Sequence, residues 1–172
     1  MKKIFFQRLI IAGTALMLNT FAPAQTSHTT PFVIADAGNH SMLLADLKAN
    51  DAKTYNHFTK AWPEAILHSV SNEKVGKHIN ATTNGNILRT RYDNKGRFQS
   101  AVLSYPCSDL SEKIADQLEQ YFPGYTVFGT VIDVTVRDKK ALLVTMENRK
   151  TWKRVRMTDD GIDVYEEYAK SK

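Results

Sequence analysis

The chain has 172 residues, of which 42% are hydrophobic and 24% are charged, the balance of an ordinary globular protein rather than of a disordered or collagen-like one. Its single cysteine excludes an internal disulfide framework and any cysteine-rich zinc site. The formal net charge is +5, from 23 basic and 18 acidic residues. Residues 1–24 hold three of the basic residues and no acidic one, so the rest of the chain carries 20 against 18, a net charge of +2. This near balance argues against a nucleic-acid partner.

The first 24 residues have the three parts of a secretory signal. Met1–Arg8 is basic, Leu9–Leu18 is mostly apolar, and Ala22-Pro23-Ala24 has the small-x-small pattern that precedes cleavage. An uncleaved membrane anchor is the alternative, but Arg8 and Asn19 cut the apolar run short of the about 20 residues that a span needs. We therefore expect a signal peptide over residues 1–24 and a periplasmic or secreted protein, with no stable membrane anchor after cleavage.

Residues 25–40 are expected to form a flexible leader, and residues 41–105 a first unit. Helical spacing occurs in Ser41–Lys48, with Ser41 as its N-cap, and in Ala52–Trp62, which Pro63 should end. Four runs with strand character follow, and the Asn84-Gly85 pair between two of them is typical of a tight hairpin. These runs are Ile66–Val70, Lys74–Thr82, Asn86–Tyr92 and Phe98–Ser104.

Residues 106–172 are expected to form a second unit of the same kind. Asp109 and Glu112 fit a capping box, and the apolar residues that follow share one helix face until Pro123-Gly124. Period-two alternation then predicts a long strand that ends at Val136 and bends at Gly129. Three more strands are predicted, over Ala141–Glu147, Thr151–Met157 and Ile162–Tyr168.

Two blocks of the first unit align with the second in the same order. Arg89–Gly96 aligns without gaps on Arg154–Gly161, and Lys60–Pro63 aligns on Gln120–Pro123. Chance is the alternative, because Asp-Gly and Asn-Gly turns are common after strands. The alignment predicts an internal repeat and an α+β fold of tandem helix-plus-antiparallel-sheet units. The helices would pack on one face of the sheet and leave the other face open, and the two sheets would join edge to edge.

These features resemble a known family. The aromatic-Pro helix ends Trp62-Pro63 and Phe122-Pro123 and the hairpins Asp93–Gly96 and Thr158–Gly161 are similar to those of the PepSY-like proteins of Bacteroidetes that are grouped with beta-lactamase inhibitor proteins. The resemblance covers Tyr55–Tyr168, and the second hairpin departs from the first in having Thr158 where Asp93 stands. It implies a secreted or periplasmic, non-enzymatic α+β protein that binds or inhibits another protein through its open sheet face, and it identifies no partner.

No pattern in the sequence predicts catalysis, a metal site or a cofactor. The five histidines are separated by 12, 17, 11 and 10 residues, without the pairs that metal sites use. Asp93–Gly96 starts like a calcium loop, but Lys95 stands where an acid is needed. Two alternatives stay open: an enzyme with dispersed groups, based on Cys107 or a histidine, and an envelope structural protein in which Cys107 cross-links a dimer. The oligomeric state is left open.

The candidate binding residues are the basic and aromatic side chains of two predicted strands. In a strand, Trp152, Arg154 and Arg156 share one face and Lys153 points to the other. Tryptophan and arginine are enriched at the centres of protein interfaces, whereas arginine stems can also simply cover a solvated sheet. We predict a partner-binding surface for a protein or peptide, made of Arg89, Arg91, Trp152, Arg154 and Arg156.

Overall fold

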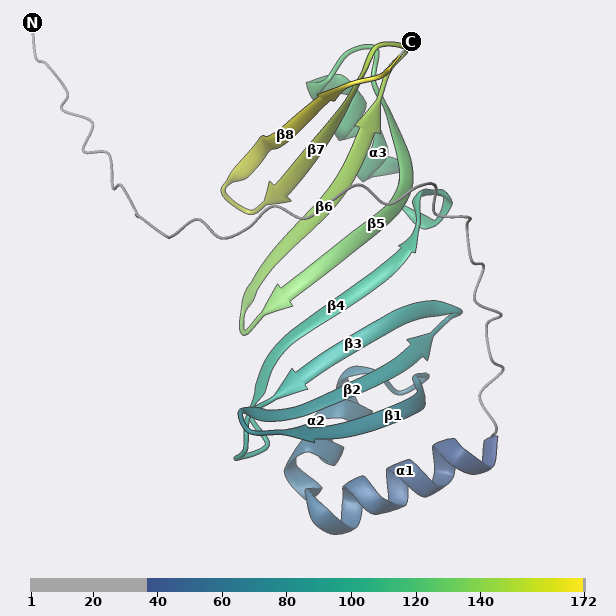
Figure 1. The fold of residues 1–172 in the computed structure, drawn as a ribbon, viewed down its shortest axis with the longest axis vertical. Coiled ribbons are helices and arrows are strands. Elements are labelled where there is room, and N and C mark those ends of the chain that lie inside the picture. Colours follow the sequence, from purple (N-terminus) through teal and green to yellow (C-terminus); the bar gives the residue numbers. More distant parts are fainter. Residues whose placement is uncertain (1–36, 172) are drawn as a thin grey trace, which may run out of the picture. The chain divides into compact units, whose positions relative to one another are not determined.

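The computed structural model describes residues 37–171, and the predicted signal peptide lies outside them. The first part contains helices α1 (Ala37–Asn50) and α2 (Ala52–Ala61) and strands β1 (Ile66–Glu73), β2 (Gly76–Thr83), β3 (Asn86–Tyr92) and β4 (Phe98–Pro106). The short 3-10 helix η1 (Cys107–Asp109) and helix α3 (Glu112–Tyr121) follow, and then strands β5 (Thr126–Val136), β6 (Lys139–Glu147), β7 (Thr151–Thr158) and β8 (Gly161–Ala169) (Figure 1). Two α-helices and four strands are thus followed by one α-helix and four strands in the described chain.

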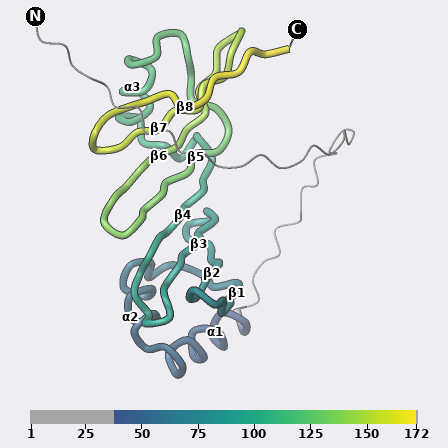
Figure 2. The backbone as a smooth tube through the Cα atoms, turned by 60° about the vertical axis from the view of Figure 1, so that its left-hand side comes forward, coloured from purple at the N-terminus to yellow at the C-terminus, as the bar shows by residue number. Residues whose placement is uncertain are grey.

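The eight strands form one antiparallel sheet in which each strand pairs with its neighbours in the sequence (Figure 2). Asn84 and Gly85 both have positive φ angles, 51° and 78°, as the hairpin predicted at this pair requires. The predicted bend in β5 is confirmed, because Gly129 has a φ of 74° and the pairing with β6 shifts register between Phe128 and Ile132. The α+β class predicted from the sequence is therefore confirmed.

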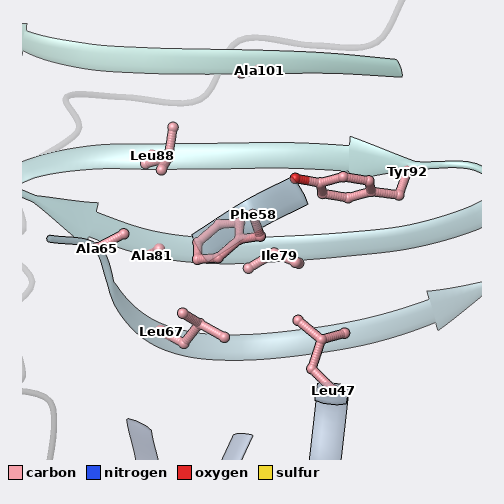
Figure 3. Packing of buried hydrophobic residues seen from close by; sticks show 9 residues of the cluster. All are labelled: Leu47, Phe58, Ala65, Leu67, Ile79, Ala81, Leu88, Tyr92 and Ala101. Carbon is pink, nitrogen blue, oxygen red and sulfur yellow. The ribbon is translucent and has the colours of Figure 1, made fainter. Parts of the chain in front are cut away.

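Two separate hydrophobic cores lie on the same face of this sheet. Leu67, Ala81, Leu88 and Leu103 are register partners across β1–β4, and all belong to the first core, under α1 and α2. Figure 3 shows Phe58 of α2 among the core side chains of β2 and β3. The second core contains Leu118 of α3 together with strand residues including Val131, Val144, Met146 and Val155.

The register shows that both cores use one face. Tyr105 and Leu103 lie on the same side of β4, because they are two residues apart, and Tyr105 pairs with Val131 of the second core. Helices α1, α2 and α3 therefore cover one face of the sheet, as predicted, and the alternate side chains form the opposite face.

Helix α1 begins earlier than predicted and covers the outer edge of β1. Ser41, expected as its N-cap, lies inside the helix, and residues 37–40, expected in the leader, are helical. His40 Nδ1 accepts a hydrogen bond of 2.9 Å from the backbone N–H of Leu67, and Asn39 Nδ2 donates one of 3.5 Å to the carbonyl of His68.

Among the described residues, no helix combines the length and apolar character that crossing a bilayer requires.

The ends of the other two helices follow the sequence only in part. Asp51 caps α2 by accepting from the backbone N–H of Thr54 at 3.1 Å, and α2 ends before Pro63 with Trp62 as its C-cap. The capping box predicted at Asp109 and Glu112 is wrong, because Cys107–Asp109 form the 3-10 turn η1. Ser111 is the N-cap of α3 instead, and its side chain makes no capping hydrogen bond.

Candidate binding surface on the uncovered sheet face

The face of the sheet opposite the helices is covered by no element among residues 37–171, and we call it the open face. Large apolar side chains on it reach solvent: Phe128 is 49% exposed, Val136 is 51% exposed and Trp152 is 40% exposed. Single exposed apolar residues are normal, but a contiguous group of them marks interaction sites.

An apolar stripe runs along β5 on the open face. It consists of Phe128, Ile132, Val134 and Val136, whose even spacing places them on one side of the strand. Its ends, Phe128 and Val136, pair with Thr145 and Lys139 of β6, which are six residues apart, so the stripe is about 20 Å long. Val102 of β4 pairs with Val134, and Leu143 of β6 pairs with Ile132, so that neighbouring strands widen the stripe.

Arginines flank the apolar stripe on both sides. Through the ladder of β4, Val134 is in register with Arg89 and Val136 with Arg91, both on β3. Through the ladder of β6, Ile132 is in register with Arg156 and Phe128 with Arg154, both on β7. Strands β3 and β7 each lie two strands from β5, a distance of about 10 Å at the usual strand spacing.

All five predicted binding residues therefore lie on the open face, in two groups. Trp152, Arg154 and Arg156 share one side of β7, and Lys153 points to the helix side, where it binds Glu167 at 2.7 Å. Arg89 and Arg91 lie four strands away, about 19 Å. The apolar stripe between them was not predicted as a binding surface, although the period-two alternation of Ile132, Val134 and Val136 indicates one apolar strand face.

The arginines of the two groups differ in their charge partners. Arg154 Nη1 binds Glu166 Oε2 at 2.9 Å, and Arg156 binds Asp163 through two hydrogen bonds of 3.0 Å each. The bonds to Asp163 raise the pKa of the Arg156 guanidinium. In contrast, the guanidinium groups of Arg89 and Arg91 make no hydrogen bond or ion pair with any residue that the structure describes.

A hollow of about 760 Å³ lies at one end of the apolar stripe, and we call it the aromatic hollow. Its walls include Phe128, Leu143, Trp152, Arg154, Tyr165 and Tyr168. Hydrogen bonds hold two of these rings: Trp152 Nε1 donates to Glu147 Oε2 at 2.9 Å, and the Tyr168 hydroxyl donates to Glu166 Oε2 at 2.8 Å. The bonds from Lys170 and from Trp152 lower the pKa of Glu147. The hollow is thus preorganised for an apolar or aromatic group.

A second hollow, of about 590 Å³, lies at the Val136 end of the stripe, and we call it the cationic hollow. Arg91, Arg137, Lys139, His78 and Val136 contribute to its walls. His78 Nε2 lies 3.2 Å from Glu73 Oε2. The cationic side chains make this hollow suited to a negatively charged group.

The two acidic side chains that line the cationic hollow do not balance its positive charge. Asp93 is bound within its own turn by Arg97, whose backbone and side-chain hydrogen bonds lower the pKa of Asp93 to about 2. Asp138 is the other lining acid. Arg91, Arg137 and Lys139 thus outnumber the one carboxylate that is not already bound.

Cys107 and the histidines are the groups on which the enzyme alternative was based. Within residues 37–171, no three His, Cys, Asp or Glu side chains gather as metal ligands would. Cys107 is a free cysteine that is partly buried and packs against the second core.

Comparison with known proteins finds likeness in solved structures. No protein-family model matches the chain, and no curated protein does. A BLIP-like protein from Bacteroides fragilis is 12% identical, with 71% of this chain and 87% of that one covered and a TM-score of 0.49. A DUF2874 family protein from Bacteroides uniformis is 14% identical, with 69% and 88% covered and a TM-score of 0.47. A DUF2874 family protein from Bacteroides ovatus is 13% identical, with 69% and 86% covered and a TM-score of 0.48. At this identity the likeness concerns the fold alone, and one of these proteins carries the name BLIP-like, after the inhibitor proteins of the resemblance given above.

Proposed function

We propose that this protein is an exported, non-enzymatic binding module that holds a protein or peptide partner on the open face of its sheet. The observation that carries the proposal is the apolar stripe of β5, which is uncovered, flanked by arginines and ended by two hollows. Protein interfaces have this composition: an apolar centre with aromatic side chains and arginine, and few other charges.

Export is part of this proposal and rests on the signal pattern of residues 1–24. Cleavage after Ala24 would leave Gln25 as the first residue. N-terminal sequencing of the protein recovered from the periplasm or medium tests it. Recovery of the uncleaved chain from the cytoplasmic fraction would contradict export.

A photo-crosslinking experiment tests the binding surface in the native envelope. A benzophenone amino acid is placed at Val134, in the middle of the stripe, or at Met42, which is 64% exposed on α1, as the control. We expect a discrete crosslinked product of one partner from position 134 and none of it from position 42. Adding Ile132→Asp, which puts a charge into the stripe, should remove the product. Identical products from both positions would show that the open face is not the binding surface.

A further inference from the structure

We infer that the partner of the open face is an extended protein segment that is acidic at one end and apolar at the other, with its carboxylates bound by Arg89 and Arg91. This inference rests on the proposed function and adds the chemistry and direction of the bound segment. It starts from the unequal charge pairing on the two sides of the apolar stripe.

The unpaired positive charge is concentrated at the Val136 end of the stripe. Arg154 and Arg156 already bind Glu166 and Asp163, so a carboxylate arriving there would have to displace an internal partner. Arg89 and Arg91 have no such partner among the described residues, and Arg137 and Lys139 line the hollow beside Arg91. Hydrogen bonds between guanidinium and carboxylate are short and strong, because both groups are charged. An acidic group therefore gains most at this end.

The spacing of these cations fits an extended segment. Arg89 and Arg91 are two residues apart on one strand, so their Cα atoms are about 7 Å apart. Alternate residues of an extended peptide have the same spacing. Two acidic residues at positions i and i+2 of a bound segment can therefore meet both arginines at once.

The other end of the stripe fits an apolar side chain. The aromatic hollow begins at Phe128, about 20 Å from Val136, and extends to Trp152, and its arginine, Arg154, is already paired. Val136 and Trp152 pair with Lys139 and Glu147 of β6, which are eight residues apart, so about eight extended residues span the distance between them. A segment of this length can place carboxylates over Arg89 and Arg91 and an aromatic or aliphatic side chain in the aromatic hollow, against Trp152 and Tyr168. We therefore assign the occupant as an acidic-to-apolar segment rather than a uniformly charged polymer.

Binding of synthetic peptides to the full exported protein tests the inference. The probe is a fluorescein-labelled nonapeptide with glutamates at positions 1 and 3 and phenylalanine at position 9, and matched peptides carry glutamine or lysine at positions 1 and 3. Fluorescence anisotropy should show that the glutamate peptide binds about tenfold more tightly than the glutamine peptide, the size expected of one or two charge-assisted hydrogen bonds. The lysine peptide should bind more weakly still. Raising the salt concentration should reduce the advantage of glutamate.

Two protein variants of equal charge change locate the effect. Arg89→Gln with Arg91→Gln should remove the preference for glutamate, whereas Arg149→Gln with Lys150→Gln, in the exposed β6–β7 turn, should preserve it. Equal binding of the glutamate and glutamine peptides, with both lost in Ile132→Asp, would overturn the acidic partner and leave the proposed function standing. A crosslinked partner at Val134 together with no binding of any of the peptides would also overturn the acidic segment and leave the proposed function standing. An oligonucleotide that competes as well as the glutamate peptide would also overturn the inference.

Discussion

Arg156 holds Asp163 across the β7–β8 ladder by two parallel hydrogen bonds, Nε to Oδ1 and Nη2 to Oδ2, both 3.0 Å long. Arg91 lies on the other side of β5, on the same face of the sheet, and its guanidinium has no carboxylate partner among the described residues. The open face thus carries two kinds of arginine. One kind is neutralised by its neighbouring strand, and the other is available to a ligand.

Removing the partner of Arg156 should change binding more than stability. Both side chains of the pair are about half exposed, and exposed ion pairs contribute about 0–1 kcal/mol. We expect Asp163→Asn to leave the urea midpoint of unfolding almost unchanged. The same variant should bind the glutamate nonapeptide more tightly, because it frees a guanidinium beside the stripe. Unchanged or weaker peptide binding would show that the charge of Arg156 does not reach the bound segment.

Gly76 should tolerate no side chain. A Cβ atom at this position would lie 1.9 Å from the carbonyl oxygen of Tyr92, on backbone that cannot move aside alone, and φ is +145°. We expect Gly76→Ala to cost about 4 kcal/mol or more in urea unfolding. Gly161→Ala is the matched control, with a φ of +143° and no atom within 4 Å of the added Cβ. It should cost only the backbone strain, about 1–3 kcal/mol. Equal losses in the two variants would disprove the role of the close approach.

The side chain of Asp51 joins α2 to the sheet, and replacing it should destabilise the folded protein. Its carboxylate accepts from Thr54 Oγ1 at 2.8 Å and pairs with Lys77 of β2 at 2.9 Å. We expect Asp51→Ala to lower the free energy of unfolding by about 1–3 kcal/mol. Asp51→Asn retains a good N-cap but not the ion pair, so it should lose less. An asparagine variant as unstable as the alanine variant would mean that the charge, and not the cap, dominates.

Acid should weaken the same contact. Burial opposes ionisation of Asp51, but the hydrogen bonds from Lys77 and Thr54 outweigh it and lower its pKa below the ordinary value of 3.8. The folded state therefore binds a proton less readily than the unfolded state. The stabilisation is complete above pH 3.8 and is lost as the pH falls through the lower pKa of the folded state. Urea midpoints measured from pH 6 downward should fall more steeply for the wild type than for Asp51→Asn.

His57 should make stability depend on pH in a higher range. Its ring stacks on the ring of Phe98, with the two ring centroids 5.0 Å apart, and its Nδ1 lies 3.0 Å from the Tyr92 hydroxyl oxygen. Burial, and then the charge of Lys60, lower the pKa of His57 below 6.5. Protonation therefore favours the unfolded state, and stability should decline as the pH falls below 6.5. Thermal midpoints should show a smaller decline for His57→Gln, and equal declines would exclude His57 as the source.

Local chemistry made much of the fold predictable. Asn84 and Gly85 specify their hairpin because both can adopt positive φ, and Pro63 follows the end of α2 because it cannot continue a helix. The capping box at Asp109 failed for a related reason. The chain after Pro106 forms the 3-10 turn η1 before α3 starts. A capping box of four residues does not show whether its first residue precedes α3 directly or belongs to a separate turn before it.

The binding surface was predictable within each strand and not between strands. Alternation alone placed Trp152, Arg154 and Arg156 on one face. The pairing of Arg156 with Asp163 depends on the register of β7 and β8, which shifts between Arg154 and Val155. The position of the stripe between β3 and β7 depends on strand order over residues far apart in the sequence. Such long-range register is set by packing of the whole sheet, not by any local pattern.

Because successive side chains of a strand point to opposite faces, residues that contact a partner can change in evolution independently of residues that form the core. Along β7, Val155 is fully buried in the second core, while its neighbours Arg154 and Arg156 stand in solvent on the other side. A codon change at either arginine can alter which molecule is held without opening a void beneath the helices. Descendants of such a chain could exchange one ligand for another, residue by residue, on an unchanged scaffold.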